Sequence, residues 1–280
     1  MKYGWRPSLP DIRDFTQEHP EVANLLQSLN LGGITGVTSP AKVDLRPSCS
    51  PVKDQGDLGA CTAFATVAAL EYAERQAFGK FLDASELFLY QRELYVQGFK
   101  DDQGADIRTA VGALAVFGAP PSHFWPYDPK KLAVKPDLEC FAFAQNFQAL
   151  TYYRLDQPGQ ALPALLNLIK TKLAAKLPVI SGFSCYSSID GDQVTKTGEV
   201  PFPQKGESQV GGHAILLVGY DDAKVIGAST GALLFKNSWG TSWGAAGYGW
   251  LPYDYVLRGQ AEDFWVLVKS EWIDTGQFGF

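Results

Sequence analysis

The apolar pattern of this chain changes partway along, from helix-like spacing to strand-like runs, and that change restricts the possible folds. Helix-like stretches dominate first, over residues 61–78, 83–98 and 106–118, with a further one over 163–177. Apolar runs of strand length then follow, over residues 178–186, 213–221, 232–239, 248–256 and 263–270. Helices gathered before strands predict an α+β chain of two lobes, and a cleft between the lobes is a natural place for a site.

The same pattern suggests three parts of the chain. Residues 1–40 form a separate segment, with one short helix expected within residues 10–30 and a flexible Gly/Ser/Thr/Pro-rich link over residues 31–40. We expect a mainly helical lobe over residues 41–145 and a mainly β lobe over residues 146–280.

Two of the expected helices carry signals at their ends. Gly79 directly follows the first helix-like stretch, which is the usual place for a glycine in the left-handed conformation. In the second stretch, Asp83 with Glu86 three positions later predicts a capping box, and Gly98 predicts the end of the helix.

The charge and hydropathy of the chain disfavour several classes of partner. The formal net charge is −6 and there is no Lys- or Arg-rich block, so neither a nucleic acid nor an acidic membrane is expected. No run approaches the roughly 18 apolar residues that a membrane helix needs. The first residues lack the apolar core of a secretory signal, so we expect a cytoplasmic protein, or one exported without a classical signal peptide.

Four cysteines are scattered along the chain, at Cys49, Cys61, Cys140 and Cys185. There is no CxxC pair and no cluster of metal-ligating residues, so neither a metal site nor another cofactor is indicated. Two disulfides are arithmetically possible. The lack of an export signal favours free thiols and a reducing compartment.

Cys61 stands where a flexible run meets a helix. In "VKDQGDLGACTAFATVAALE" (residues 52–71), the glycine-punctuated part ends in Cys61, and this cysteine opens the helical pattern. A helix N-terminus offers unsatisfied N–H groups and about half a positive charge, which favour a thiolate. An ordinary thiol, with a pKa of about 8.5, is mostly protonated at neutral pH, so a nucleophile here also needs a base. Taken alone, Cys61 could equally be a buried structural thiol.

The base must come from one of three histidines. His19 lies in the front segment and His123 in a proline-rich connection, whereas His213 in "SQVGGHAILLVGYD" opens an apolar strand. Asn237 and Trp239 end a second strand, where an amide can orient the imidazole and an indole can shield that bond from water. Taken singly, His213 could merely cap a strand, and the Asn-Ser-Trp-Gly turn could be a glycine-rich corner with an aromatic core residue.

Together these blocks resemble the papain-like cysteine peptidases. "PVKDQGDLGACTAFA", "VGGHAILLVGYD" and "KNSWGTSWGAAGYGW" resemble the family's cysteine, histidine and asparagine blocks, in family order. "VDLR" at residues 43–46 resembles the start of the mature family chain, and the likeness covers about residues 41–270. The resemblance implies a two-lobe fold, with a helical lobe, an antiparallel β-barrel-like lobe and the active-site cleft between them.

The resemblance also implies a role for each matching residue. Cys61 would be the nucleophile and His213 its general base and acid, while Asn237 would orient His213 under the shielding Trp239. The Gln55 side chain and the Cys61 backbone N–H would bind the oxyanion, a kind of donor that typically contributes about 3 kcal/mol. The implied reaction is peptide hydrolysis, expected of an endopeptidase, by thiolate attack and a thioester acyl-enzyme. We expect a resting thiolate–imidazolium pair, which titrates as a pair.

The chain departs from the family pattern at three positions. Leu58 replaces a cysteine, which removes a common disulfide. Thr62 replaces an aromatic residue that helps to wall the cleft. Gly212 stands where many relatives carry a polar or charged residue, and we expect it to alter the pH optimum rather than to abolish activity.

The resemblance places a peptide or protein substrate against Gly104 and Ala105, where the family has two glycines whose backbone pairs with an extended chain. Ile107 falls at the pocket for the side chain two residues before the cut, which predicts an apolar or aromatic preference there. Gly212 and Trp239 complete the expected substrate-binding residues.

Residues 1–40 are shorter than the usual family propeptide. The stretch "GWRPSLPDIRDF" is stiffened by prolines and carries an aromatic residue that could plug a groove. We therefore hypothesise intramolecular inhibition, in which this segment limits access to the cleft. The alternative is an ordered strap that stabilises the lobes away from Cys61.

Two other functions remain open from the sequence. A Cys-His-Asn acyltransferase of the transglutaminase-like type would use the same side chains with an amine in place of water. A non-catalytic peptide-binding module would keep the fold without the chemistry. The intact set of Cys61, Gln55, His213 and Asn237 argues against such a module, because binding alone does not need all four.

Overall fold

The computed structural model describes residues 2–28 and 39–272, so most of the predicted flexible link lies outside the described residues. The helices are α1 (Pro20–Ser28), α2 (Cys61–Phe78), α3 (Glu86–Val96), α4 (Ile107–Phe117), α5 (Leu138–Ala144), α6 (Leu162–Ala174), α7 (Asp192–Thr197) and α8 (Asp254–Leu257). The strands are β1 (Lys42–Asp44), β2 (Phe147–Arg154), β3 (Val179–Tyr186), β4 (Gln209–Ile226), β5 (Ser229–Lys236), β6 (Tyr248–Pro252) and β7 (Ala261–Trp272).

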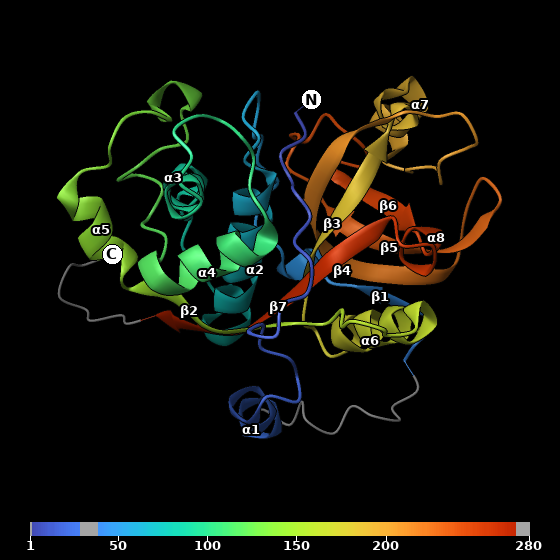
Figure 1. Cartoon of the computed structure of the whole chain (residues 1–280), viewed down its shortest axis with the longest axis horizontal. Helices are drawn as coiled ribbons and strands as arrows, with labels where there is room; N and C mark the ends of the chain where they lie inside the picture. The colour runs from blue at the N-terminus through green and yellow to red at the C-terminus, as the bar shows by residue number, and fades with distance from the viewer. Residues whose placement is uncertain (1, 29–38, 273–280) are drawn as a thin grey trace.

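The strands form one antiparallel sheet in the order β2-β7-β3-β4-β5-β6, with β1 paired to β4. Figure 1 shows α2 to α5 on one side of the molecule and β3 to β6 on the other, with the first residues of the chain passing between them. The predicted α+β class is confirmed. The path of the sheet runs from one edge strand to another, so it is open and only loosely barrel-like.

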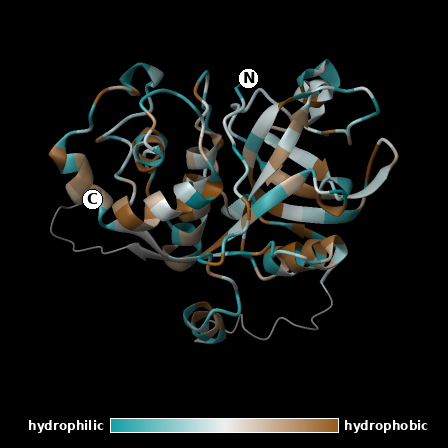
Figure 2. Ribbon diagram, in the orientation of Figure 1, coloured by the Kyte–Doolittle hydropathy of each residue, from teal (hydrophilic) through white to brown (hydrophobic). Residues whose placement is uncertain are grey.

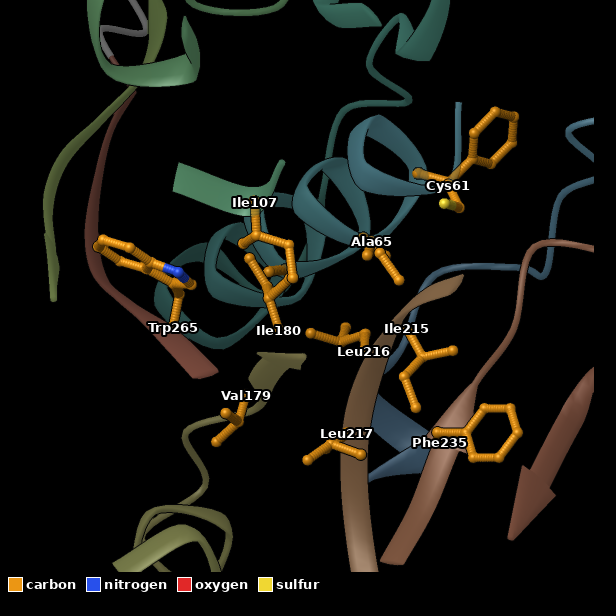
Figure 3. Packing of buried hydrophobic residues seen from close by; sticks show 14 of the residues in the cluster. Cys61, Ala65, Ile107, Val179, Ile180, Ile215, Leu216, Leu217, Phe235 and Trp265 are labelled. Carbon is orange, nitrogen blue, oxygen red and sulfur yellow. The ribbon is translucent and has the colours of Figure 1, made fainter. Parts of the chain in front are cut away.

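The core joins α2 to the sheet. Nearly every residue of α2 up to Glu74 is buried, and many of them are alanines, which let the helix approach β4 and β7 closely. Figure 3 shows Ala65 of α2 near Leu216 and Ile215 of β4 in this buried cluster. Figure 2 shows hydrophobic colour on α4 and α6, while several connecting loops are hydrophilic. The packing fixes the first turn of α2 against β4.

The helix of the first predicted stretch has the expected ends. It runs over Cys61–Phe78, and Gly79 follows in the left-handed conformation with φ of 72°.

The predicted capping box of the next helix is wrong. The N-cap of α3 is Ser85, whose Oγ accepts the Phe88 amide at 3.1 Å. Asp83 instead forms an ion pair with Lys53, a partner distant in sequence. The helix ends at Val96, and Gly98 follows the C-cap Gln97 in the left-handed conformation with φ of 73°, so the predicted glycine end is confirmed.

The five predicted strands all occur, but their extents differ. β4 is longer than its apolar run, and β6 ends at Pro252, which has no amide hydrogen to continue the ladder. The short β1 and the strand β2 were not predicted. Both pair with strands far away in the sequence, and such pairing leaves no local signal.

All four cysteines lie in the described part of the chain, where each is a buried free thiol, as predicted. The compartment that keeps them reduced stays a prediction. Of the helices within residues 2–28 and 39–272, none is both long and apolar enough to cross a bilayer.

Candidate active site

Cys61 is the first residue of α2, and its side chain is fully buried. Ala60, at the N-cap, offers no side-chain acceptor to the first amides of the helix. Figure 3 shows Cys61 at the margin of the buried cluster between α2 and β4. The thiol therefore occupies the helix-end position that the sequence predicted.

His213, Asn237 and Trp239 come together where two strands lie side by side. His213 belongs to β4, and Asn237 directly follows β5, the neighbour of β4. Nε2 of His213 lies 2.7 Å from Oδ1 of Asn237. The Trp239 indole stacks on the imidazole, with ring centroids 4.2 Å apart and planes inclined by 26°. All three side chains are buried, so water is kept from the His213–Asn237 bond.

This bond determines which imidazole nitrogen is basic. The Asn237 oxygen also accepts the Ser238 amide at 2.8 Å, which fixes its orientation. Because an amide oxygen only accepts hydrogen bonds, Nε2 of His213 carries the proton and Nδ1 is the basic nitrogen. Nδ1 is buried and has no hydrogen-bond partner among the residues described.

Cys61 and His213 are near each other, but no hydrogen bond joins the sulfur to Nδ1. The sulfur lies within reach of the Ala214 amide, and Ala214 directly follows His213 in β4. Catalytic contacts are often loose in the absence of substrate and tighten when it binds. The arrangement therefore brings nucleophile and base to one place without the direct contact.

Gln55 lies beside this pair and is fully buried. Its Oε1 accepts the Ser238 hydroxyl at 2.6 Å, which turns Nε2 outward as a donor. Nε2 donates to the Leu58 carbonyl at 2.8 Å and lies 3.3 Å from the Lys2 carbonyl. The amide predicted to bind an oxyanion thus already holds a carbonyl oxygen of the chain itself.

Residues 2–6 pass between α2 and the strands β3 and β4 (Figure 1), and Trp5 forms an isolated parallel bridge with Ala105. The Ala105 amide donates to Gly4 O and the Arg6 amide to Ala105 O, both at 2.9 Å. On the other side, the Trp5 amide donates to Gly212 O at 3.0 Å. Ala105 and Gly212 are two of the predicted substrate-binding residues, so the segment uses the backbone groups expected to hold a substrate.

Close contact with this segment depends on glycines. A Cβ on Gly104 would lie 2.1 Å from the Gly4 oxygen, and one on Gly212 would lie 2.6 Å from the Trp5 oxygen. The departure from the family pattern at Gly212 therefore has a steric explanation, because any side chain there would clash with Trp5.

The Trp5 indole fills a pocket that has two glycines in its wall, Gly182 and Gly212. A Cβ on Gly182 of β3 would lie 1.9 Å from the indole ring, so only glycine leaves this space. At the base of the pocket, Trp5 Nε1 donates to Asp263 Oδ2 at 3.2 Å. Asp263 also accepts the Ser8 hydroxyl at 2.9 Å and forms an ion pair with Arg154 at 3.4 Å. The segment is thus anchored by an aromatic residue and by polar contacts.

Burial makes the neutral forms of nucleophile and base favourable here. Burial raises the pKa of Cys61 to about 11, although the Ala214 and Gly4 amides partly oppose it. Burial likewise lowers the pKa of His213 to about 4, against the Asn237 hydrogen bond. At neutral pH the closed site therefore favours thiol and imidazole. The resting thiolate–imidazolium pair expected from the sequence is not favoured while the segment excludes water.

The remaining predicted residues are placed as follows. Ile107 is the first residue of α4 and is buried, and Figure 3 shows it near Ile180; its part in a substrate pocket stays a prediction. Thr62 donates to Oε2 of buried Glu93 at 2.5 Å, so its hydroxyl is held in the interior. His19 and His123 lie in other parts of the fold, and within residues 2–28 and 39–272 no cluster of metal-ligating side chains occurs.

Sequence reasoning missed Lys2 of the segment itself and two residues that the segment contacts, Asp102 and Asp263. Asp263 is the one with a usable signal, an acidic residue that opens an apolar strand run. Its φ of +66° is unusual for a residue other than glycine and marks a constrained position.

The comparisons with known proteins agree with this geometry. The family description "Papain family cysteine protease" matches residues 39–262. An uncharacterised peptidase C1-like protein of Acanthamoeba polyphaga mimivirus is 33% identical over 273 residues, which cover 95% of this chain and 86% of that protein. Chymopapain of Carica papaya is 28% identical over 247 residues, covering 85% of this chain and 57% of chymopapain.

Solved structures show the same likeness. Xylellain, a cysteine protease from Xylella fastidiosa, is 34% identical and superposes with a TM-score of 0.76, covering 95% of both chains. Digestive procathepsin L 3 of Tenebrio molitor larval midgut is 22% identical, with a TM-score of 0.61 and coverage of 82% of this chain and 70% of its own. At that identity it supports the fold alone.

Proposed function

Because this chain belongs to the papain family of cysteine proteases, we propose that Cys61 cleaves peptide bonds and that residues 2–6 close its site. One observation carries the proposal. The imidazole of His213 is fixed by Asn237 under Trp239, and the amide of the next residue, Ala214, lies within reach of the Cys61 sulfur at the start of α2.

The chemistry follows from this arrangement. Nδ1 of His213 takes the thiol proton, and the thiolate attacks the carbonyl carbon of the peptide. The charge that develops on the oxygen is stabilised by Gln55 Nε2 and the Cys61 amide. His213 then protonates the leaving amine, which leaves a thioester on Cys61. A water molecule, activated by the same nitrogen, hydrolyses the thioester.

The closed arrangement opposes each of these steps. The Lys2 carbonyl occupies the Gln55 amide, Trp5 fills a side-chain pocket, and the Ala105 and Gly212 backbone groups are already bonded. The segment also excludes water and so favours the neutral thiol over the thiolate. Turnover therefore requires the segment to leave, and the activity of the full chain scales with its open fraction.

The same contacts suggest the substrate. An extended peptide would pair with the backbone of Ala105 and Gly212 once the segment has left. The pocket that Trp5 vacates accommodates an indole beside Gly182, so it suits an aromatic side chain of the kind expected two residues before the cut.

Substituting Trp5→Ala in the full chain is expected to raise kcat/KM for a peptide with an aromatic residue at that position. Losing the buried indole weakens the closed state by about 2 kcal/mol, which corresponds to roughly a 30-fold rise in the open fraction. Turnover is measured with a fluorogenic peptide, and folding by circular dichroism.

The matched control is Ile12→Ala, because Ile12 lies a few residues after the segment and its side chain is fully exposed. It should leave turnover unchanged. If Trp5→Ala keeps its fold and gains no activity, the segment is a strap and the gating proposal is wrong.

A further inference from the structure

Lys2 occupies two parts of the site at once. Its carbonyl oxygen lies 3.3 Å from Gln55 Nε2, the donor proposed to hold the attacked carbonyl. Its ammonium group forms a hydrogen-bonded ion pair with Asp102. Lys2 therefore contacts the proposed oxyanion donor through its carbonyl and a carboxylate through its side chain. One lysine residue is long enough to reach from Gln55 to Asp102.

Asp102 is held rigidly beside the nucleophile. Its carboxylate accepts the Gly59 amide at 3.0 and 3.2 Å, and Gly59 lies two residues before Cys61. It also accepts the Tyr90 hydroxyl, which itself accepts the Gly104 amide at 3.1 Å. The side chain is 14% exposed, so it is mostly shielded from water but reachable.

The charge of Asp102 is balanced by the segment. Of the cationic side chains in the described residues, Lys2 is the one within ion-pair distance of Asp102. When the segment leaves, the carboxylate keeps its two neutral donors and loses its cation. A substrate that brings a cation to this position restores the pair, whereas an uncharged side chain leaves the carboxylate without a countercharge.

We infer that Asp102 is a specificity-determining residue that selects Lys or Arg as the residue supplying the attacked carbonyl. The inference rests on the proposed function of Cys61. We place one substrate residue where Lys2 lies, with its carbonyl at Gln55 and its side chain at Asp102. Because a single residue is placed, the direction in which the segment runs does not enter.

Two peptides that differ only in this residue, arginine in one and its uncharged isostere citrulline in the other, test the inference with the full-length chain. The ratio of their kcat/KM values is independent of the open fraction, because that fraction multiplies both. We expect arginine to be preferred by about tenfold or more, as for a shielded charge-assisted hydrogen bond. In Asp102→Asn the ratio should fall to near 1.

The control is Asp101→Asn, which removes the same charge from the exposed neighbouring residue and should keep the preference. A ratio near 1 in the wild-type chain overturns the inference, even if Asp102→Asn fails to fold. A ratio lost equally in Asp101→Asn also overturns it, because net charge would then be the cause. If neither peptide is hydrolysed and Cys61 resists alkylating inhibitors, the proposed function itself fails, and the inference fails with it.

Discussion

Replacing Cys61 or His213 by alanine is expected to lower kcat/KM for peptide hydrolysis by about four orders of magnitude. Without the sulfur no thioester forms. Without the imidazole the thiol keeps its proton, because an ordinary thiol is mostly protonated at neutral pH and no neighbouring base remains to take the proton. The double variant should lose little more than either single variant, since both residues serve one step. The measurement is single-turnover and steady-state hydrolysis in the Trp5→Ala background, where the open fraction is larger.

Matched controls exist for both substitutions. Cys140→Ala removes another buried thiol, from α5, and His123→Ala removes a histidine away from the site. Both should retain the activity of the parent. If Cys61→Ala or His213→Ala kept more than about a tenth of that activity, the proposed mechanism would be wrong, since removing such groups typically costs far more.

Substituting Gln55→Glu is expected to lower kcat by a factor of about 100 to 1,000, with a smaller change in KM. The isosteric carboxylate cannot donate to the oxyanion, and its negative charge opposes the charge that develops there. The carboxylate can accept the Ser238 hydroxyl as the amide oxygen does but cannot donate to the Leu58 carbonyl, so the fold of the variant is checked by circular dichroism. Steady-state kinetics in the Trp5→Ala background separate the effects on kcat and KM.

The control for Gln55 is Gln76→Glu, which makes the same chemical change at an exposed residue near the end of α2. It should leave both constants unchanged. A rise in KM with kcat unchanged in Gln55→Glu would assign Gln55 to uniform substrate binding rather than to the oxyanion.

The sequence was a good guide to the fold wherever the signal is local. The helix from Cys61 to Gly79 follows from apolar spacing and a left-handed glycine, and both are properties of neighbouring residues. The predicted Asp83 cap was wrong because Asp83 forms an ion pair with Lys53, thirty residues earlier in the chain. Ser85 is the N-cap instead. β2 was missed because its partner is the distant β7. The proposed division at residues 40 and 145 stays a prediction.

The same distinction between local signals and long-range contacts holds for the active site. The pairing of His213 with Asn237 under Trp239 was expected, since each residue lies in a recognisable block. The burial that raises the pKa of Cys61 and lowers that of His213 was not expected, because it depends on what covers Cys61. The sequence of the front segment suggested that its aromatic residue could plug a groove, but the family pattern over residues 41–270 cannot reveal that Lys2 would be bound beside Gln55 and Asp102. These contacts arise only when the chain folds back on itself.

The central claim is that Cys61 is made reactive by His213 once the segment opens. Its most direct measurement is covalent labelling of the full-length Trp5→Ala protein by an epoxide inhibitor of papain-like enzymes, followed by intact mass and peptide mapping. We predict one label per chain, on Cys61, and no label when His213→Ala is added. Labelling at Cys49, Cys140 or Cys185 instead, or undiminished labelling of Cys61 without His213, would contradict the account.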